Sequence, residues 1–367
     1  MALNQVGLER LNTATTKKIG TNKNKIINGE FLVNQRGNST NGSNSGYFGP
    51  DRFKWRDVNS SSVFTINQST DTPDGFAFSY HADCTTADAS FGGNEFISIQ
   101  HKLEGQNLQD FAKGTSSAEQ YTLSFHVKSD VTGTYVVAFQ DTDNNRMCCA
   151  TYTVSSADTW EKKTITIPAD TTGAFNNDAN ESLMISWCLG AGTDYTSGTL
   201  QTVWGADVSA NTFAGQTANV GSSTDNDFRL TGVQLEVGSV ATDFEHRSYS
   251  DEFQKCLRYY EQMSSNGVSV AYFATGYCES TTEVNYPILF KAYKRATPTV
   301  TSTAGSTFRN HHTGTSVDLS NIVFNLATPM SCRAQATASS AVLGDGNAAI
   351  LAAHSSTEAL IKIDAEL

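Results

Sequence analysis

The sequence predicts an all-β protein: an antiparallel jelly-roll β-sandwich, a connecting helix, and a second, smaller C-terminal β-sandwich. Hydrophobic residues make up 38% of the chain and charged residues only 17%, so Ser, Thr, Asn and Gly carry much of its polarity. That composition suits short strands joined by turns better than long charged helices. Apolar stretches that alternate with period two also recur without helices between them, which indicates antiparallel pairing.

The length of the chain sets the number of domains. At 367 residues the chain is longer than a domain with a single hydrophobic core usually is. We therefore expect an N-terminal arm, a jelly roll, a connecting helix and a C-terminal β domain, over residues 1–25, 26–247, 248–266 and 267–367.

The strands of the first domain are predicted from alternation between turns. The clearest is 121–127, where Tyr121, Leu123, Phe125 and Val127 share one face and His126 lies on the polar face. The stretches 135–139 and 149–154 form a hairpin around 141–145. The other predicted strands are 26–33, 63–66, 76–80, 96–100, 163–167, 183–189, 200–204 and 228–236.

A helix is predicted after the first domain. Ser248 or Ser250 can cap it, and Asp251 and Glu252 favour its first turn. Asn266-Gly267 is a typical end. We expect this helix to pack between the two domains, because one stripe at helical spacing is apolar: Tyr249, Phe253, Cys256, Leu257, Tyr260 and Met263.

The last hundred residues predict a second β unit. Pro287 and Pro298 indicate edge strands or strand starts. The polar stretch 305–316 is expected to be a loop. The predicted strands are 268–278, 282–293, 297–303, 322–326 and 360–363.

Charge and cysteine content exclude several classes. The net charge of −12 argues against nucleic-acid binding. No apolar run approaches the ~20 residues of a membrane span. The N-terminus lacks the apolar core of a signal peptide, so we expect synthesis in a cytoplasm. The seven cysteines form no Cys-x-x-Cys pair and are expected to be free, buried thiols.

Catalytic signatures are absent from the sequence, and we expect no enzyme. There is no G-x-S-x-G, HExxH or phosphate-binding glycine loop. Asp141, Asp143 and Asn145 have the spacing of a calcium loop, but Arg146 replaces its glycine and Tyr152 its terminal glutamate. This segment is therefore interpreted as a solvated hairpin tip.

Two separated motifs carry a resemblance to a known family. Asn28-Gly29-Glu30-Phe31 is followed by Val33, Gln35, Arg36 and Gly37, and then by Asp-Arg-Phe-Lys-Trp at 51–55. Leu-Thr-Gly-Val-Gln-Leu-Glu-Val-Gly at 230–238 leads to Phe-Glu-His-Arg-Ser-Tyr at 244–249, and then to Cys256, Arg258, Tyr259, Tyr260 and Glu261. These motifs resemble the start and end of the carbohydrate-binding-module-like jelly rolls of bacteriophage tail proteins. Tyr286-Pro287 and Ala-Thr-Pro-Thr-Val at 296–300 resemble the β unit that follows there.

The resemblance implies a phage virion structural protein, often a homotrimer, made in the host cytoplasm and located in the virion. A tail fibre or adhesin that attaches to host surface glycan is the leading hypothesis. The alternatives are a non-adhesive part of the tail tip, needle or head, and a glycan-degrading enzyme. The basic residues Arg10, Lys17, Lys18, Lys23 and Lys25 predict that residues 1–25 dock onto another virion protein.

The resemblance also directs the search for sites. We expect glycan contacts in the second domain, where aromatic and planar polar side chains lie near predicted turns: Tyr272, Tyr277, Asn310, His311 and His312. Adjacent histidines on a strand face opposite ways, so His311 and His312 do not share a metal. Glu30 with Asp227 is the candidate for a structural calcium, as in related sugar-binding folds; no other cofactor is expected.

Overall fold

The computed structural model describes residues 23–39, 44–312, 314–354 and 358–367. They form two compact units with separate cores. The first ends at Glu252 and also holds Leu367, and the second is Phe253–Glu366. All strand pairs are antiparallel, and 44% of the chain is strand against 8% helix, so the predicted all-β class is confirmed. No helix of the described residues is long and apolar enough to span a membrane.

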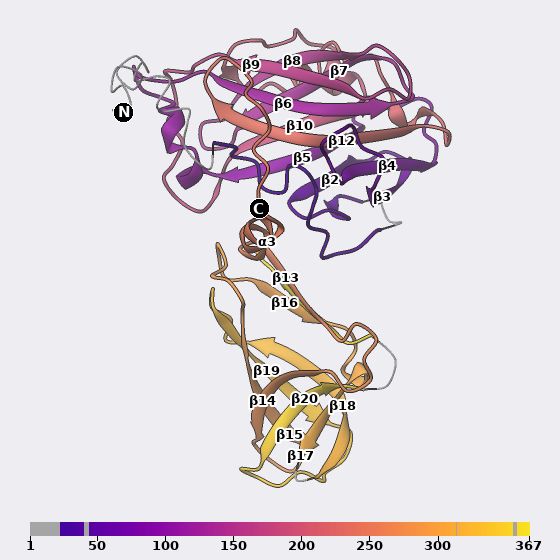
Figure 1. The fold of residues 1–367 in the computed structure, drawn as a ribbon, viewed down its shortest axis with the longest axis vertical. Helices are drawn as coiled ribbons and strands as arrows, with labels where there is room; N and C mark the ends of the chain where they lie inside the picture. Colours follow the sequence, from indigo (N-terminus) through magenta and orange to yellow (C-terminus); the bar gives the residue numbers. More distant parts are fainter. Residues whose placement is uncertain (1–22, 40–43, 313, 355–357) are drawn as a thin grey trace, which may run out of the picture. The chain divides into compact units, whose positions relative to one another are not determined.

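The first unit contains a seven-stranded and a five-stranded sheet (Figure 1). In order, the larger sheet has β1 (Gly46–Tyr47), β2 (Phe53–Val58), β5 (Phe96–Glu104), β10 (Glu181–Ala191), β7 (Gly133–Asp141), β8 (Arg146–Val154) and β11 (Gly205–Ala206). The smaller has β3 (Val63–Ser69), β4 (Ser79–Thr86), β12 (Asp227–Val237), β6 (Tyr121–Ser129) and β9 (Glu161–Ile167). Short helices lie in the connections: η2 (Gly105–Asn107), η3 (Gln109–Phe111), α2 (Thr193–Thr196), η4 (Ser209–Asn211) and η5 (Val220–Ser222).

Large aromatic side chains fill the space between these sheets. Phe125 on β6 meets Trp187 on β10 edge to face, with ring centroids 6.0 Å apart. The predicted alternation of β6 is confirmed, because Tyr121, Leu123 and the two residues that follow at this spacing are buried in this core. The predicted jelly-roll region is thus a two-sheet sandwich.

Residues 26–33 are not the strand that was predicted. Asn28 and Phe31 have φ of 63° and 57°, which bends the backbone. The Asn28 amide holds this bend: Nδ2 donates to the carbonyls of Val33 at 2.8 Å and Asp51 at 2.9 Å, and Oδ1 accepts from the Val33 N–H at 2.9 Å. A buried side chain thus takes the place of a neighbouring strand. The prediction for 200–204 is also wrong, since the short β11 follows it.

The predicted N-terminal arm overlaps the sandwich. Its residues 1–22 lie outside the described residues. Lys25 forms an ion pair with Asp110 at 2.7 Å, and its N–H donates to Leu235 O at 2.8 Å. Asn24 is buried. The last three residues assigned to the arm therefore belong to the body of the first unit.

The predicted helix is real but shorter than expected. It is α3 (Tyr249–Leu257), within which the chain passes from one unit to the next. Ser248 is the cap, since its Oγ accepts from the Asp251 N–H at 3.2 Å. Tyr260 and Met263, expected on the helix, lie in β13 (Tyr260–Ser264), which pairs with β21 (Leu360–Asp364). The predicted span 248–266 is therefore wrong in its second half.

The second unit closes into a barrel rather than a second sandwich. Its order is β14 (Tyr272–Cys278), β15 (Glu283–Leu289), β19 (Ser331–Ala338), β18 (Thr315–Asn325), β17 (Phe308–His312) and β20 (Ala348–Ala353). A three-stranded sheet of β13, β21 and β16 (Thr299–Ser302) accompanies it, and η6 (Gly305–Thr307) precedes β17. β17, β19 and β20 were not predicted.

The seven cysteines are free and buried, as predicted. Burial raises the pKa of the Cys148 and Cys149 thiols to about 12, so both stay protonated at neutral pH. Their adjacency in sequence has no chemical consequence, because Cys148 lies in the sandwich core and Cys149 on the opposite face of the sheet.

Candidate functional site

The five residues predicted to bind glycan divide between the outside and the inside of the barrel. Tyr272 and Tyr277 on β14 are exposed. His311 lies beside Tyr272, with ring centroids 5.8 Å apart. Asn310 and His312 are buried on the opposite face of β17. The placement of adjacent histidines on opposite faces is therefore confirmed.

Asn310 and His312 are thus not available to an external ligand. The stretch expected as a loop contains β17, whose alternate side chains point into the barrel. Asn310 Oδ1 accepts from the Tyr286 hydroxyl at 2.8 Å, and Nδ2 lies 3.4 Å from His312 Nδ1. The sequence pattern showed polarity, but these polar groups satisfy one another inside the core.

The structure does not bring the two predicted calcium ligands together. Glu30 Oε2 lies 2.9 Å from His246 Nδ1. Asp227, at the start of β12, pairs with Arg229 and lies 3.3 Å from His81 Nε2. Gly29 O accepts from the Val233 N–H at 2.8 Å, six residues further along β12, or about 20 Å at strand rise. Among the described residues no group of three or more His, Cys, Asp or Glu is arranged to hold a metal.

The hairpin tip at 141–145 is held by a buried ion pair. Asp141 and Lys113 are both buried, and the Lys113 ammonium lies 2.5 Å from one Asp141 oxygen and 3.0 Å from Asp170. The other Asp141 oxygen accepts N–H bonds from Asp143 and Asn144 at 3.1 Å. Asp141 is therefore a structural residue with its acceptors in use. The hairpin turn is confirmed, but the prediction that it is solvated is wrong for Asp141, which is buried.

The first unit has a groove on the outer face of its seven-stranded sheet. The segment after β10, with α2 and η4, covers part of this face by packing Phe213 against Val136, Ala138 and Met147. Next to this cover the face stays open in a groove of about 440 Å³. Its lining residues come from β2, β5, β7, the turn between β7 and β8, β10 and the covering segment: Arg56, Phe96, Gln100, Gln140, Asn145, Met184, Ser186, Tyr195, Asp207, Ser209, Thr212 and Phe213.

Aromatic rings form one wall of this groove. Phe96 meets Tyr195 edge to face at 4.7 Å and Phe213 at 5.4 Å between centroids. The Arg56 guanidinium lies over the Phe96 ring, 5.9 Å from its centroid. Phe213 is buried, whereas Phe96 and Tyr195 are half-buried. This wall therefore presents apolar ring surface beside a cation.

Amides and hydroxyls form the floor. Gln100 and Ser186 are register partners on β5 and β10, and Gln100 Nε2 donates to Ser186 Oγ at 3.2 Å. One row further, Met184 pairs with Gln140 on β7. Gln140 Nε2 donates to the exposed carboxylate of Asp207 at 2.9 Å, which orients the amide. Planar polar groups in fixed orientation thus line the groove.

Burial also perturbs a carboxylate on the opposite face of β2 from the groove. Asp57 follows Arg56 on β2 and is buried. Burial raises its pKa to about 7, and the nearby charges of Glu95 and Asp88 add to this rise, while the Ser60 N–H and Arg56 oppose it. The charge of Asp57 therefore changes near neutral pH, on the face of β2 that does not line the groove.

Sequence reasoning missed this groove. Arg56, Gln100 and Gln140 stand at the polar positions of alternating strands, where solvated side chains are the ordinary interpretation. The available signal was the stretch between β10 and β12, which is rich in Thr, Gly, Ala and Ser, contains Tyr195, Trp204 and Phe213, and is too long for a simple turn. The strands that this segment covers are set by the order of the strands in the sheet, and no local sequence pattern specifies that order.

Comparisons with known proteins give fold likenesses only. No protein-family model and no curated protein matches the sequence. Solved structures with similarity include the enzymatically active domain of tailspike protein 4 of bacteriophage CBA120, at 10% identity and TM-score 0.31; the match covers 59% of this chain and about a fifth (21%) of that one.

Carbohydrate-binding modules are also among the similar structures. A structure described as CBM4 matches at 15% identity and TM-score 0.27, over 58% of this chain and 99% of that one. The family 11 module from Clostridium thermocellum, in complex with a mixed-linked tetrasaccharide, matches at 9% identity and TM-score 0.28, over 52% and 91%. At these scores the likenesses carry no argument about function, and the fold described above rests on the sheets of this chain.

Proposed function

We propose that this chain is a bacteriophage virion protein of the tail-fibre or adhesin kind, which attaches to host surface glycan through the groove of its first unit. The groove carries the binding part of this proposal. A sugar offers C–H faces to aromatic rings and hydroxyls to amides, carboxylates and guanidinium groups. The groove brings all of these into one cavity: Phe96, Tyr195, Gln100, Gln140, Asp207 and Arg56.

The volume and lining of the groove fit this use. About 440 Å³ is within the range of small-ligand sites. Gln140 keeps Oε1 as an acceptor while Nε2 is held by Asp207, so the amide presents a defined edge. Side chains on neighbouring strands of one sheet move little on binding, which lowers the entropic cost of weak polar contacts.

The virion part of the proposal is supported by the motifs at 28–37, 51–55 and 230–249, which resemble phage tail proteins. On this proposal the protein is not an enzyme, the part of residues 1–25 that precedes Lys23 anchors it to another virion protein, and it assembles as a homotrimer. Light scattering tests the last point, with an expected mass three times the 39.5 kDa of one chain; a single-chain mass contradicts it.

A glycan array on the full chain tests the binding proposal, followed by titration calorimetry on the strongest ligand. Gln140→Ala should weaken binding about tenfold, as for the loss of one or two hydrogen bonds. Gln120→Ala is the matched control, because Gln120 is exposed just before β6 and does not line the groove. Failure of every glycan to bind, or equal affinity of the two variants, overturns the assignment of this groove.

A further inference from the structure

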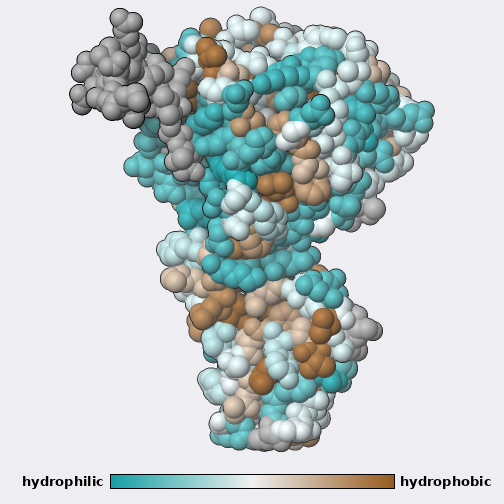
Figure 2. All heavy atoms as spheres, viewed as in Figure 1, coloured by the Kyte–Doolittle hydropathy of each residue, from teal (hydrophilic) through white to brown (hydrophobic). Residues whose placement is uncertain are grey.

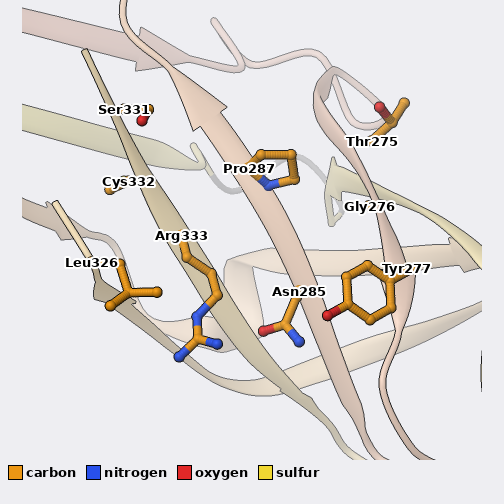
Figure 3. A pocket seen from close by; sticks show the side chains of 9 residues that line it. All are labelled: Thr275, Gly276, Tyr277, Asn285, Pro287, Leu326, Ser331, Cys332 and Arg333. Atoms are coloured by element: carbon orange, nitrogen blue, oxygen red, sulfur yellow. The ribbon is translucent and has the colours of Figure 1, made fainter. Parts of the chain in front are cut away.

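The barrel carries a second hollow, on its outer face. It has a volume of about 530 Å³ and is lined from β14, β15, β19 and the end of β18. Figure 3 shows the Asn285 side chain between the Tyr277 ring and the Arg333 guanidinium, with Pro287 beside them. The remaining lining residues are Thr275, Gly276, Leu326, Ser331 and Cys332.

The sequence of β15 explains why the wall opens here. β15 pairs with β19 from Glu283 to Leu289 but with β14 only at Asn285 and Val284. Pro287 has no N–H to offer β14, so the ladder ends before it. At Gly276 the strands are so close that a Cβ would lie 2.0 Å from Asn285 O. The strands cross tightly at the glycine and separate at the proline, which creates the hollow.

Asn285 supplies a buried acceptor without a partner. It is 3% exposed, and its Oδ1 accepts no hydrogen bond from the described residues. Its Nδ2 donates to the Glu279 carboxylate, which fixes the orientation of the amide. A buried acceptor left unpaired costs free energy, so a ligand that donates to it is favoured.

Arg333 supplies an oriented cation. Its Nε donates to Asn325 Oδ1 at 2.7 Å, and Asn325 Nδ2 is held in turn by Gln335 Oε1 at 3.3 Å. Within the described part of the chain, no carboxylate lies at ion-pair distance from Arg333, although the protein carries a net charge of −12. The two terminal NH₂ groups thus present a planar fork to an anion.

Apolar surface completes the hollow. Tyr277 is 51% exposed, and Leu326 is 71% exposed. Leu326 has φ of 51°, a conformation that a leucine rarely adopts. Strained backbone of this kind persists where the surrounding structure imposes it, often at binding sites.

We propose that this hollow binds an acidic sugar residue, with its carboxylate on Arg333, a ring hydroxyl donating to Asn285 Oδ1, and its C–H face on Tyr277. The cation, the unpaired acceptor and the aromatic ring of the hollow then each contact a different group of the same sugar. Neutral sugars satisfy only the acceptor and the ring, and simple anions only the arginine. This site lies in the second unit and does not depend on the groove of the first.

The test is titration of the full chain with methyl β-D-glucuronide and methyl β-D-glucoside. The two differ only at C6, which is a carboxylate in the first and a hydroxymethyl group in the second. The glucuronide should bind at least tenfold more tightly, and this preference should fall with added salt. Arg333→Gln should remove the preference. Arg309→Gln is the control, since Arg309 pairs with Asp318 and does not line the hollow.

A second variant separates loss of binding from loss of folding. Leu326→Gly suits the φ of 51° and should fold at least as well, yet bind the glucuronide several-fold more weakly because one wall is gone. Equal binding of the two glycosides overturns the proposal, as does wild-type preference in Arg333→Gln. A preference that Gln140→Ala removes and Arg333→Gln retains assigns the acidic sugar to the sandwich groove and also overturns it.

Discussion

The sandwich and the barrel fill their interiors with side chains of different size. In the first unit the fully buried side chains include Trp55, Trp187, Phe53 and Phe64. In the barrel, Tyr286 is the largest fully buried side chain. On β19 and β20 the inward side chains other than Leu351 are small: Cys332, Ala334, Ala336, Ala338, Ala349 and Ala353.

The difference follows from geometry. Two facing sheets lie about 10 Å apart, and large side chains from both must meet to close that space. A six-stranded barrel has a narrower interior, in which Tyr286 and Phe308 lie among aliphatic side chains and alanines, without a tryptophan. Both hollows described above lie on outer faces of the sheets. In the view of Figure 2 the sandwich shows a mostly hydrophilic surface, and hydrophobic patches cover part of the barrel.

Trp187→Ala should have the largest effect on the sandwich. The side chain is fully buried between rings, so its loss should lower the free energy of unfolding of the first unit by about 3–5 kcal/mol. Denaturant unfolding followed by fluorescence measures it. Trp160→Ala is the control, as Trp160 is half-buried and donates to Asp71 at 3.0 Å; equal losses would contradict the role given to large aromatics.

Ala336→Leu should destabilise the barrel because it enlarges a buried side chain, whereas Trp187→Ala destabilises the sandwich because it removes one. Ala336 is fully buried between Val284 and Ile322, so extra methyl groups should cost about 1–3 kcal/mol through overpacking. Thermal unfolding measures it. Thr337→Leu, one residue on and facing outward, should change stability far less. A stabilised Ala336→Leu would mean that the barrel interior has unused space.

Tyr286→Phe tests the polar contact inside the barrel. The change leaves Asn310 Oδ1 without its 2.8 Å hydroxyl donor, so stability should fall by about 1–2 kcal/mol with no loss of packing volume. Tyr277→Phe is the control, since that ring is half exposed. An unchanged melting temperature would show that Asn310 finds another donor.

Asp57→Asn should have no effect at pH 4, so its effect is visible only as a dependence on pH. The pKa is about 7 in the fold and near 3.8 when unfolded, so Asp57 favours folding most below pH 4, and this contribution is lost as pH rises to 7. The variant should match the wild type at pH 4 and exceed it at pH 8, by at most the about 4 kcal/mol that this pKa difference corresponds to. Exposed Asp158→Asn should leave the pH profile unchanged.

Predictions from the sequence were best where local alternation agreed with burial. β6, β7, β8, β9, β10 and β12 were found because one face of each is apolar. β19 and β20 were missed since alanine has no strand preference and their burial comes from barrel closure. Tyr260 and Met263 fitted helical spacing, yet pairing with β21, a hundred residues later, made their segment a strand.

The candidate sites were harder to predict than the strands. Of the five predicted glycan residues, Tyr277 lines one of the two hollows described above, and the other four line neither. Asn310 and His312 were chosen for their polarity, and the barrel buried them. Arg56, Gln100 and Gln140 come from three strands, so their meeting depends on a sheet order that brings β2, β5 and β7 into one face.

Composition, alternation and turn residues were sufficient to establish an all-β chain of two units with free thiols and a capped helix near the boundary. These properties depend on contacts between near neighbours in sequence. Barrel closure, the groove and the hollow required tertiary structure, because each depends on which distant strands pair and where a proline or a covering segment leaves a face open. Hydrophobic burial selects the face of a strand, whereas long-range pairing selects its neighbours.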